Sequence, residues 1–223
     1  LELSRVLFRS SLQTEEFPPI RAVKGDGSIT LRQDILQRMF ARTSFAICLD
    51  QARHNLTGLL FELDGGKLTV VATDGRRMSL AIQDEDIPKK TSVKVIIPSK
   101  TVHEFERLLC GEGDVIIHIE ESQAGFTFDR VRIVSALIEG NFPNYQMVVP
   151  QKHDKEVVVN TAKFTESMRR AHAMTNDKFN SVRIAAGEGV MTLKVVTPEV
   201  GEHTEDLVVE YAGETVEIAF NPG

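Results

Sequence analysis

Apolar side chains recur at three- and four-residue intervals in three stretches of the chain, at 31–44, 99–109 and 160–175. This spacing puts them on one side of an amphipathic helix, so each stretch is predicted to be a helix that packs by one face. Ser99, and Asn160 or Thr161, stand where helix N-caps are expected. The predicted buried faces are Ile35, Leu36, Met39, Phe40 and Thr43; Val102, Phe105, Leu108 and Leu109; and Phe164, Met168, Ala171 and Thr175.

Between the helices, short β-rich runs are bounded by Gly, Pro, Asp or Asn, which is the pattern of strands. They include LTGLLFEL, KLTVVAT, RMSLAI, VKVIIP, DVIIHIE and VRIVSAL, and later VRIAA, MTLKVV, EDLVVEY and TVEIAF. LDGGK at 63–67 and GEGV at 187–190 are predicted hairpin turns. The predicted fold class is α+β, with antiparallel sheets that each carry one or two helices.

Two patterns recur at one offset, which indicates tandem repeated domains. Phe142-Pro143 follows Phe17-Pro18 by 125 positions, and TLKVVTPE at 192–199 follows KLTVVATD at 67–74 by the same number. We predict a complete middle domain at 17–150 and a truncated C-terminal domain at 151–223. Residues 1–16 are predicted to hold the end of a preceding domain and an artefactual leader, because 5–10 read as a translated sequencing adapter. A native leader strand is the alternative.

The composition is that of a soluble globular protein: 42% of the 223 residues are hydrophobic and 26% are charged. The apolar runs are too short to span a bilayer, and the chain shows no secretory signal. Cys48 and Cys110 lack metal-ligand spacing and are predicted to be small buried hydrophobes, which makes the cytoplasm the default compartment. The six histidines are scattered, so we expect neither a metal site nor a cofactor.

The formal net charge of -6 argues against nucleic-acid binding by the chain as a whole. Two predicted helices are nevertheless locally basic. The first carries Arg32, Arg38 and Arg42 against Asp34, and the last carries Lys163, Arg169 and Arg170 against Glu166. These could be ordinary solvated helix faces. Alternatively, equivalent helices of tandem repeats could present one basic surface to a phosphate backbone.

The stretch VVATDGRRMS at 70–79 raises a choice between chemistry and structure. Asp74-Gly75 between alternating runs predicts a two-residue hairpin turn, but a turn does not explain Arg76 and Arg77. The chain has no nucleophile elbow, P-loop or dinucleotide-binding glycine pattern. The enzymatic alternative is a metal-dependent nuclease or hydrolase that uses Asp74 with His54 or Asp50. It is disfavoured because the carboxylates are dispersed along the sequence.

The segment EGNFPNYQMVVPQ at 139–151 joins the two repeats and is unusually apolar for a linker. Such a linker is usually packed against a domain. It could also form the floor of a groove between domains, where ligand sites often occur.

Several strings, in family order, resemble the bacterial DNA polymerase III beta subunit, the sliding clamp family: RHNLTGLLFE, ATDGRRMSLA, IIPSK, ALIEGNFPNYQMVVP and NDKFNSVRI. The resemblance runs from Phe17 to Pro222. It implies the DNA clamp fold, with three similar domains per chain, and a homodimeric ring around double-stranded DNA. It implies no catalysis: the family tethers the replicative polymerase to its template and so confers processivity. The chain would hold the end of the first domain, the second domain and part of the third.

The resemblance also implies site residues. Partners such as the polymerase, the clamp loader and other clamp-motif proteins would insert a short peptide with a Leu-Phe-like end into a cleft formed by Leu56, Thr73, Gly75, Arg76, Arg77, Met78, Pro143, Met147 and Val148. Sequence-independent DNA contacts would come from Arg38, Arg42, Arg53, His54, Lys100, Lys163 and Arg169, and the dimer interface from Ala173 and Met174. Met147 stands where many members have Arg, and His54 and Asn55 replace aromatic residues seen in some members.

Overall fold

The computed structural model describes residues 23, 27–85, 91–198 and 200–222. They divide into two compact units with the boundary between Gln146 and Met147, here called unit 1 and unit 2. The leader predicted within 1–16 lies outside the described residues. Within the part of the chain that the structure describes, no helix is long and apolar enough to cross a membrane.

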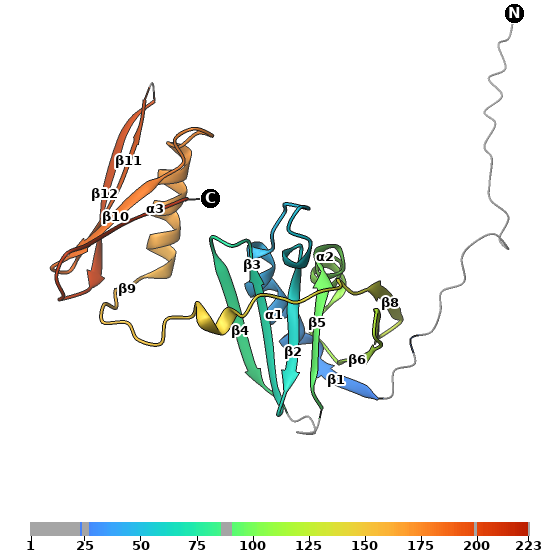
Figure 1. Cartoon of the computed structure of the whole chain (residues 1–223). Coiled ribbons are helices and arrows are strands. Elements are labelled where there is room, and N and C mark those ends of the chain that lie inside the picture. The colour runs from blue at the N-terminus through green and yellow to red at the C-terminus, as the bar shows by residue number, and fades with distance from the viewer. Residues whose placement is uncertain (1–22, 24–26, 86–90, 199, 223) are drawn as a thin grey trace, which may run out of the picture. The chain divides into compact units, whose positions relative to one another are not determined.

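The described residues of unit 1 form two four-stranded antiparallel sheets, two α-helices and the short 3-10 helices Ser44–Ala46 and His54–Leu56 (Figure 1). One sheet has the order β1-β6-β7-β8 and the other β4-β3-β2-β5, here called the second sheet. The helices are α1 (Gln33–Thr43) and α2 (Ser99–Leu108). The strands are β1 (Ser28–Arg32), β2 (Gly58–Asp64), β3 (Lys67–Thr73), β4 (Met78–Asp84), β5 (Val93–Pro98), β6 (Asp114–Ile119), β7 (Gln123–Phe128) and β8 (Val131–Ala136).

The main core of unit 1 forms where strand alternation turns side chains towards the helices. Phe61 of β2 and Val70 of β3 meet Phe40 of α1 and Phe105 of α2 in one buried cluster. The Phe105 ring packs edge-on against Phe126, with their centroids 4.7 Å apart, a favoured aromatic geometry. The predicted apolar stripes of both helices therefore supply the core.

The predicted buried face is confirmed in full for α1 and only in part for the other two helices, and the predictions fail at some ends. All five residues of the predicted α1 face are buried, but Leu31 belongs to β1 rather than to the helix. Ser99 is not the N-cap of α2: Pro98 is, and no side chain caps this end. Leu108 is exposed, contrary to the prediction, whereas Leu109 is buried, because the chain leaves the helix after Leu108 in an extended conformation that turns Leu109 inward.

The hairpin turns at 63–67 and 187–190 are confirmed as two-residue turns. Asp64 pairs with Lys67 across Gly65 and Gly66, both at positive φ. Gly187 pairs with Val190 across Glu188 and Gly189, again at positive φ. A two-residue hairpin turn that matches the strand twist requires this backbone region.

Unit 2 is a five-stranded antiparallel sheet, β13-β10-β11-β12-β9, with one helix packed on it. Its order β13-β10-β11-β12 corresponds to β5-β2-β3-β4 of unit 1. Asn160 caps α3 by accepting a hydrogen bond from the main-chain N–H of Lys163 at 3.1 Å, as predicted. The elements are β9 (Val158–Val159), α3 (Thr161–Ala173), β10 (Val182–Gly187), β11 (Val190–Thr197), β12 (Gly201–Glu210) and β13 (Val216–Phe220).

The two cysteines differ, which corrects the prediction that both are buried. Cys48 is buried, but Cys110 is exposed. Cys110 follows α2 in a loop beside Gln33, whose side-chain oxygen lies 3.4 Å from the Cys110 sulfur. The loop glycines Gly111 and Gly113 take positive φ, and this turn carries the thiol to the surface.

Candidate functional site

The hairpin between β3 and β4 carries the candidate site and is here called the rim hairpin, residues 73–78. Thr73 pairs with Met78, so the loop between the paired residues is 74–77 and not the predicted two-residue turn. The reason is the Asp74 side chain, which accepts hydrogen bonds from the main-chain N–H groups of Arg76 and Arg77, each at 2.9 Å. Asp74 can do so in an ordinary backbone region, and only Gly75 takes positive φ.

Asp74 is a structural residue in this geometry. Burial raises its pKa, but the two main-chain N–H donors and the nearby Arg77 charge lower it, and the net shift is downward. A general base near neutral pH needs the opposite tuning. Asp74 also forms an ion pair with Arg77, and Asp50 forms one with Arg53. No group of three or more potential metal ligands occurs among the described residues, so the nuclease alternative gains no support.

The loop presents two arginines at the surface. Arg76 and Arg77 are both exposed. The Arg77 guanidinium lies 5.7 Å from the centroid of the Phe45 ring, within the range of a cation–π contact. Arg53 donates to the main-chain oxygen of Asp74 at 2.5 Å. The rim hairpin is therefore tied to the loop around Arg53, and the Arg77 side chain stays exposed although its guanidinium pairs with Asp74.

An apolar cluster lies beside the rim hairpin. Leu56 is buried in it, and Met78 packs against it while remaining partly exposed. The cluster occupies the face of the second sheet that points away from α1 and α2, here called the outer face. Its buried members are Cys48, Leu56, Leu60, Val71, Ile96 and Phe142, and Met78, Leu80, Ile138 and Tyr145 pack against them.

The segment after β8 covers the outer face; residues 138–145 are here called the linker segment (Figure 1). Ile138 forms an isolated antiparallel bridge with Ile96 of β5. Asn55 donates to the Asn141 main-chain oxygen at 2.9 Å, and Phe142 is buried. The predicted cleft residue Pro143 follows Phe142 directly and is exposed. Of the two possibilities for this apolar segment, packing against a domain describes residues 138–145.

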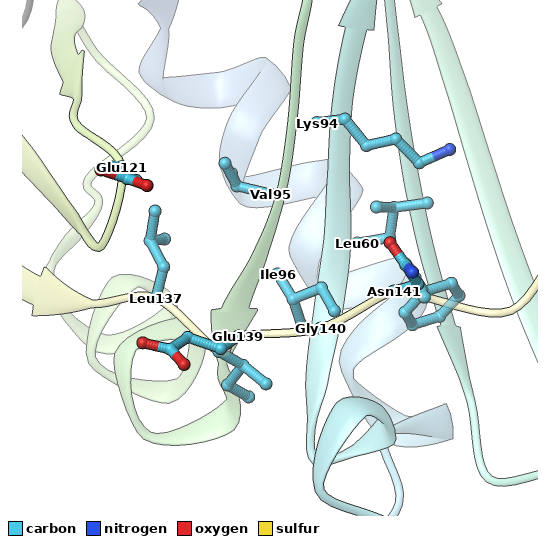
Figure 2. A pocket seen from close by; sticks show the side chains of 11 residues that line it. Leu60, Lys94, Val95, Ile96, Glu121, Leu137, Glu139, Gly140 and Asn141 are labelled. Atoms are coloured by element: carbon cyan, nitrogen blue, oxygen red, sulfur yellow. The ribbon is translucent and has the colours of Figure 1, made fainter.

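A groove of about 570 Å³ runs along the linker segment, where the segment crosses β5 (Figure 2). Apolar side chains such as Leu60, Ile96 and Leu137 line it together with Lys94 and Glu139. None of these residues was predicted as a site residue. The sequence of β2 could have indicated this covered face, because Leu59, Leu60 and Phe61 are apolar at consecutive positions. A strand reads this way when both of its faces are covered.

The predicted DNA-facing residues are all exposed: Arg38, Arg42, Arg53, His54, Lys100, Lys163 and Arg169. Asp34 of α1 pairs with Arg32 at 2.6 Å. Arg38 donates a hydrogen bond to the Gln83 side-chain oxygen at 3.3 Å, and neither Arg38 nor Arg42 forms an ion pair within the part of the chain that the structure describes. On α3, Arg170 takes Glu166 and Glu205 as partners. The basic side chains that remain on α1 and α3 can thus meet an external anion.

The remaining predicted site residues belong to unit 2. Met147 and Val148 are largely exposed, at 82% and 66%. Of the predicted dimer-interface residues, Ala173 is exposed, and Met174 is half-buried against the unit 2 core. The Met174 main-chain oxygen accepts a hydrogen bond from the Thr197 hydroxyl at 2.6 Å, which fixes the end of α3 against β11.

Two family models match the chain. Residues 30–144 match the central domain of the DNA polymerase III beta subunit, and residues 146–223 match its C-terminal domain. The beta sliding clamp of Pseudomonas aeruginosa is 34% identical over 218 residues, a match that covers 95% of this chain and 58% of the relative. The chain thus spans somewhat more than half the length of the curated relatives that it matches.

Solved structures give the same result. The DNA polymerase sliding clamp from Bacillus subtilis superposes with a TM-score of 0.89 at 29% identity, covering 95% of this chain and 57% of that one. A sliding clamp from Pseudomonas aeruginosa, solved bound to griselimycin, has a TM-score of 0.87 at 33% identity, covering 95% and 57%. The α+β clamp fold expected from the sequence is confirmed.

Proposed function

The chain belongs to the DNA polymerase III beta subunit family, and from this we propose that it is part of a sliding clamp subunit that encircles duplex DNA and tethers the replicative polymerase. In this proposal unit 1 is the middle clamp domain and unit 2 belongs to the C-terminal one. The protein would be a non-catalytic cytoplasmic processivity factor that acts as a homodimeric ring, with Ala173 and Met174 at the dimer interface and the clamp loader among its partners.

The observation that carries the proposal is the structure of the rim hairpin. An apolar floor that includes Leu56 and Met78 lies beside two exposed arginines. A floor of this kind suits the Leu and Phe side chains of a partner peptide, since fully burying one such side chain contributes about 1.5–3 kcal/mol. The stems of Arg76 and Arg77 can pack along the peptide while their charged heads stay in water. Thr73 and Gly75 shape the loop, and resemblance to the family adds Pro143, Met147 and Val148 to the proposed site.

Exposed cations on two helices support the DNA part of the proposal. Arg42 and Arg38 on α1, and Lys163 and Arg169 on α3, have no carboxylate partner among the described residues. Lysine and arginine contacts to phosphates bind DNA without reading its sequence, and such binding weakens steeply as salt rises. An acidic chain with these basic helix faces fits a protein that must hold DNA loosely and avoid other polyanions.

The experiment that tests the peptide site is calorimetry with griselimycin, the compound bound to the Pseudomonas aeruginosa relative, and with a synthetic peptide that ends in Leu-Phe. Replacing Arg76→Ala together with Met78→Ala removes one rim cation and part of the floor. We expect a loss of affinity of tenfold or more for the peptide. The control pair, Arg130→Ala with Val208→Ala, changes two exposed residues outside the site and should bind like the parent. Equal affinity of both double variants would contradict the site assignment.

A further inference from the structure

The linker segment is fixed to the outer face by a polar contact that the apolar packing does not require. The Tyr145 hydroxyl donates a hydrogen bond to Glu62 Oε2 at 3.0 Å. The other carboxylate oxygen of Glu62 accepts from the Lys94 ammonium group at 3.1 Å. Glu62 and Lys94 are directly opposite each other on β2 and β5, so one carboxylate joins two strands and the linker segment.

The three groups are complementary in charge and protonation. A tyrosine phenol is protonated at neutral pH and can donate; burial, followed by the hydrogen bond to Glu62, raises the pKa of Tyr145 further. A hydrogen bond to a charged acceptor is stronger than one between neutral groups. The Glu62 side chain is only 22% exposed, which protects this bond from competition by water. Figure 2 shows Lys94 and Leu60 on the same side of the sheet as Asn141 of the linker segment.

This contact lies close in sequence and in packing to the proposed peptide site. Phe142 and Tyr145 flank Pro143, and both pack in the cluster that contains Leu56 and Met78. Packing of Phe142 alone contributes apolar burial, but dispersion contacts are not directional. The Tyr145 hydroxyl adds direction, because a hydrogen bond weakens steeply when its angle departs from linear. The position of Pro143, between Phe142 and Tyr145 in the linker segment, therefore depends on the hydrogen bond from Tyr145 to Glu62.

We propose that Glu62, acting through Tyr145, is a positioning residue for the peptide site: it fixes the linker segment on the outer face so that the linker side of the site is formed before the peptide arrives. Lys94 holds Glu62 in the required orientation from β5. The inference rests on the proposed function of the rim hairpin as a peptide site. It assigns a role to three residues that do not themselves belong to that site.

The test compares Tyr145→Phe with Tyr211→Phe in the full chain. Each variant removes one hydroxyl, and the Tyr211 hydroxyl donates a hydrogen bond to the Glu214 main-chain oxygen within unit 2, the unit that does not contain the linker segment. With the Leu-Phe peptide as probe, we expect Tyr145→Phe to weaken binding by about three- to tenfold and Tyr211→Phe by less than about twofold. Hydrogen exchange at the Ile138 amide, which bonds to the Ile96 main-chain oxygen, should speed up in Tyr145→Phe alone.

Glu62 variants separate positioning from general stability. Glu62→Ala should weaken binding as much as Tyr145→Phe does, and combining the two should add no further loss, because both break the same contact. Glu62→Gln keeps an acceptor oxygen and should restore most of the affinity. If the parent binds the peptide and Tyr145→Phe binds equally well, the positioning role is wrong while the peptide site stands. If the parent does not bind, the proposed function fails and the positioning role fails with it.

Discussion

The second sheet of unit 1 and the sheet of unit 2 share a strand order. The outer face of the second sheet and the corresponding face of the unit 2 sheet differ in what covers them. Val71 of β3 and Val196 of β11 are related by the repeat, 125 positions apart. Val71 is fully buried under the linker segment, whereas Val196 is 56% exposed and Val208 of β12, on the same face as Val196, is 84% exposed. Of these two corresponding strands, β3 in unit 1 is therefore packed on both faces, whereas β11 in unit 2 is packed on one.

The difference shows how a connecting segment forms the apolar floor of the proposed site. By covering the outer face, the linker segment buries Leu60, Val71 and Ile96 in a second core on the opposite side of the sheet from the helices. Met78 stands at the border of this core and stays partly exposed. An apolar floor with an accessible edge results in unit 1. The uncovered face of unit 2 offers no such border among the described residues.

The largest effect is expected from removing the linker anchor. Phe142→Ala takes away a buried ring and should destabilise unit 1 by about 3–5 kcal/mol, because the cluster around Leu60 and Val71 would lose its cover. Phe179→Ala is the matched control in unit 2, since that ring is 45% exposed, and should cost about 1 kcal/mol or less. Denaturant unfolding of both variants measures the difference. Equal losses would mean that the linker segment does not form a core with the sheet.

A smaller effect on stability is expected when the same substitution is made at one position on the covered face of unit 1 and at the corresponding position on the exposed face of unit 2. Val71→Thr places a hydroxyl in the buried cluster and should destabilise unit 1 by about 1–3 kcal/mol if the hydroxyl finds no partner. Val196→Thr makes the same change on the exposed face of unit 2 and should stay within about 0.5 kcal/mol of the parent. Thermal unfolding of the two variants tests this, and a larger cost for Val196→Thr would reverse the comparison.

The smallest expected effect on stability concerns the ion pair that joins α3 to β12 in unit 2. Hydrogen bonds from Arg170 and then from Ser167 lower the pKa of Glu205 from 4.5 to about 2. A carboxyl whose pKa is lower in the folded state stabilises the fold above pH 4.5, and this contribution is lost as the pH falls towards 2. Glu205→Gln should therefore be less stable than the parent at pH 7 and equal to it near pH 2. A stability difference that does not change with pH would contradict the assigned ion pair.

Much of this architecture could be predicted from residue patterns. The buried face of α1 follows from the spacing of Ile35, Leu36, Met39 and Phe40, because helical periodicity alone decides which side chains share a face. The turn at Gly65-Gly66 follows from a backbone requirement that glycine meets at little cost. The exposed thiol of Cys110 could not be predicted, because it depends on a loop held by Gln33 from a distant part of the sequence.

At the candidate site, local sequence patterns predict only part of the structure. The Asp74-Gly75 pair correctly predicted a hairpin at this position, but the predicted loop length of two residues was wrong. The Asp74 carboxylate accepts hydrogen bonds from two main-chain N–H groups, and this favours a longer loop. The contact between Tyr145 and Glu62 joins residues 83 positions apart. No periodicity encodes such a pair. The arginines and Met78 were selected by resemblance to a family, and the structure supplies the apolar floor beside them.

The central claim is that the rim hairpin and its apolar floor bind a partner peptide. Chemical-shift mapping of the labelled chain, titrated with a synthetic peptide that ends in Leu-Phe, tests it most directly. The account predicts that the largest shifts occur at the amides of residues 73–78 and at the side chains of Leu56 and Met78. Shifts confined to other surfaces, such as the groove beside Lys94 and Glu139, would contradict it, and so would a spectrum that does not change at saturating peptide.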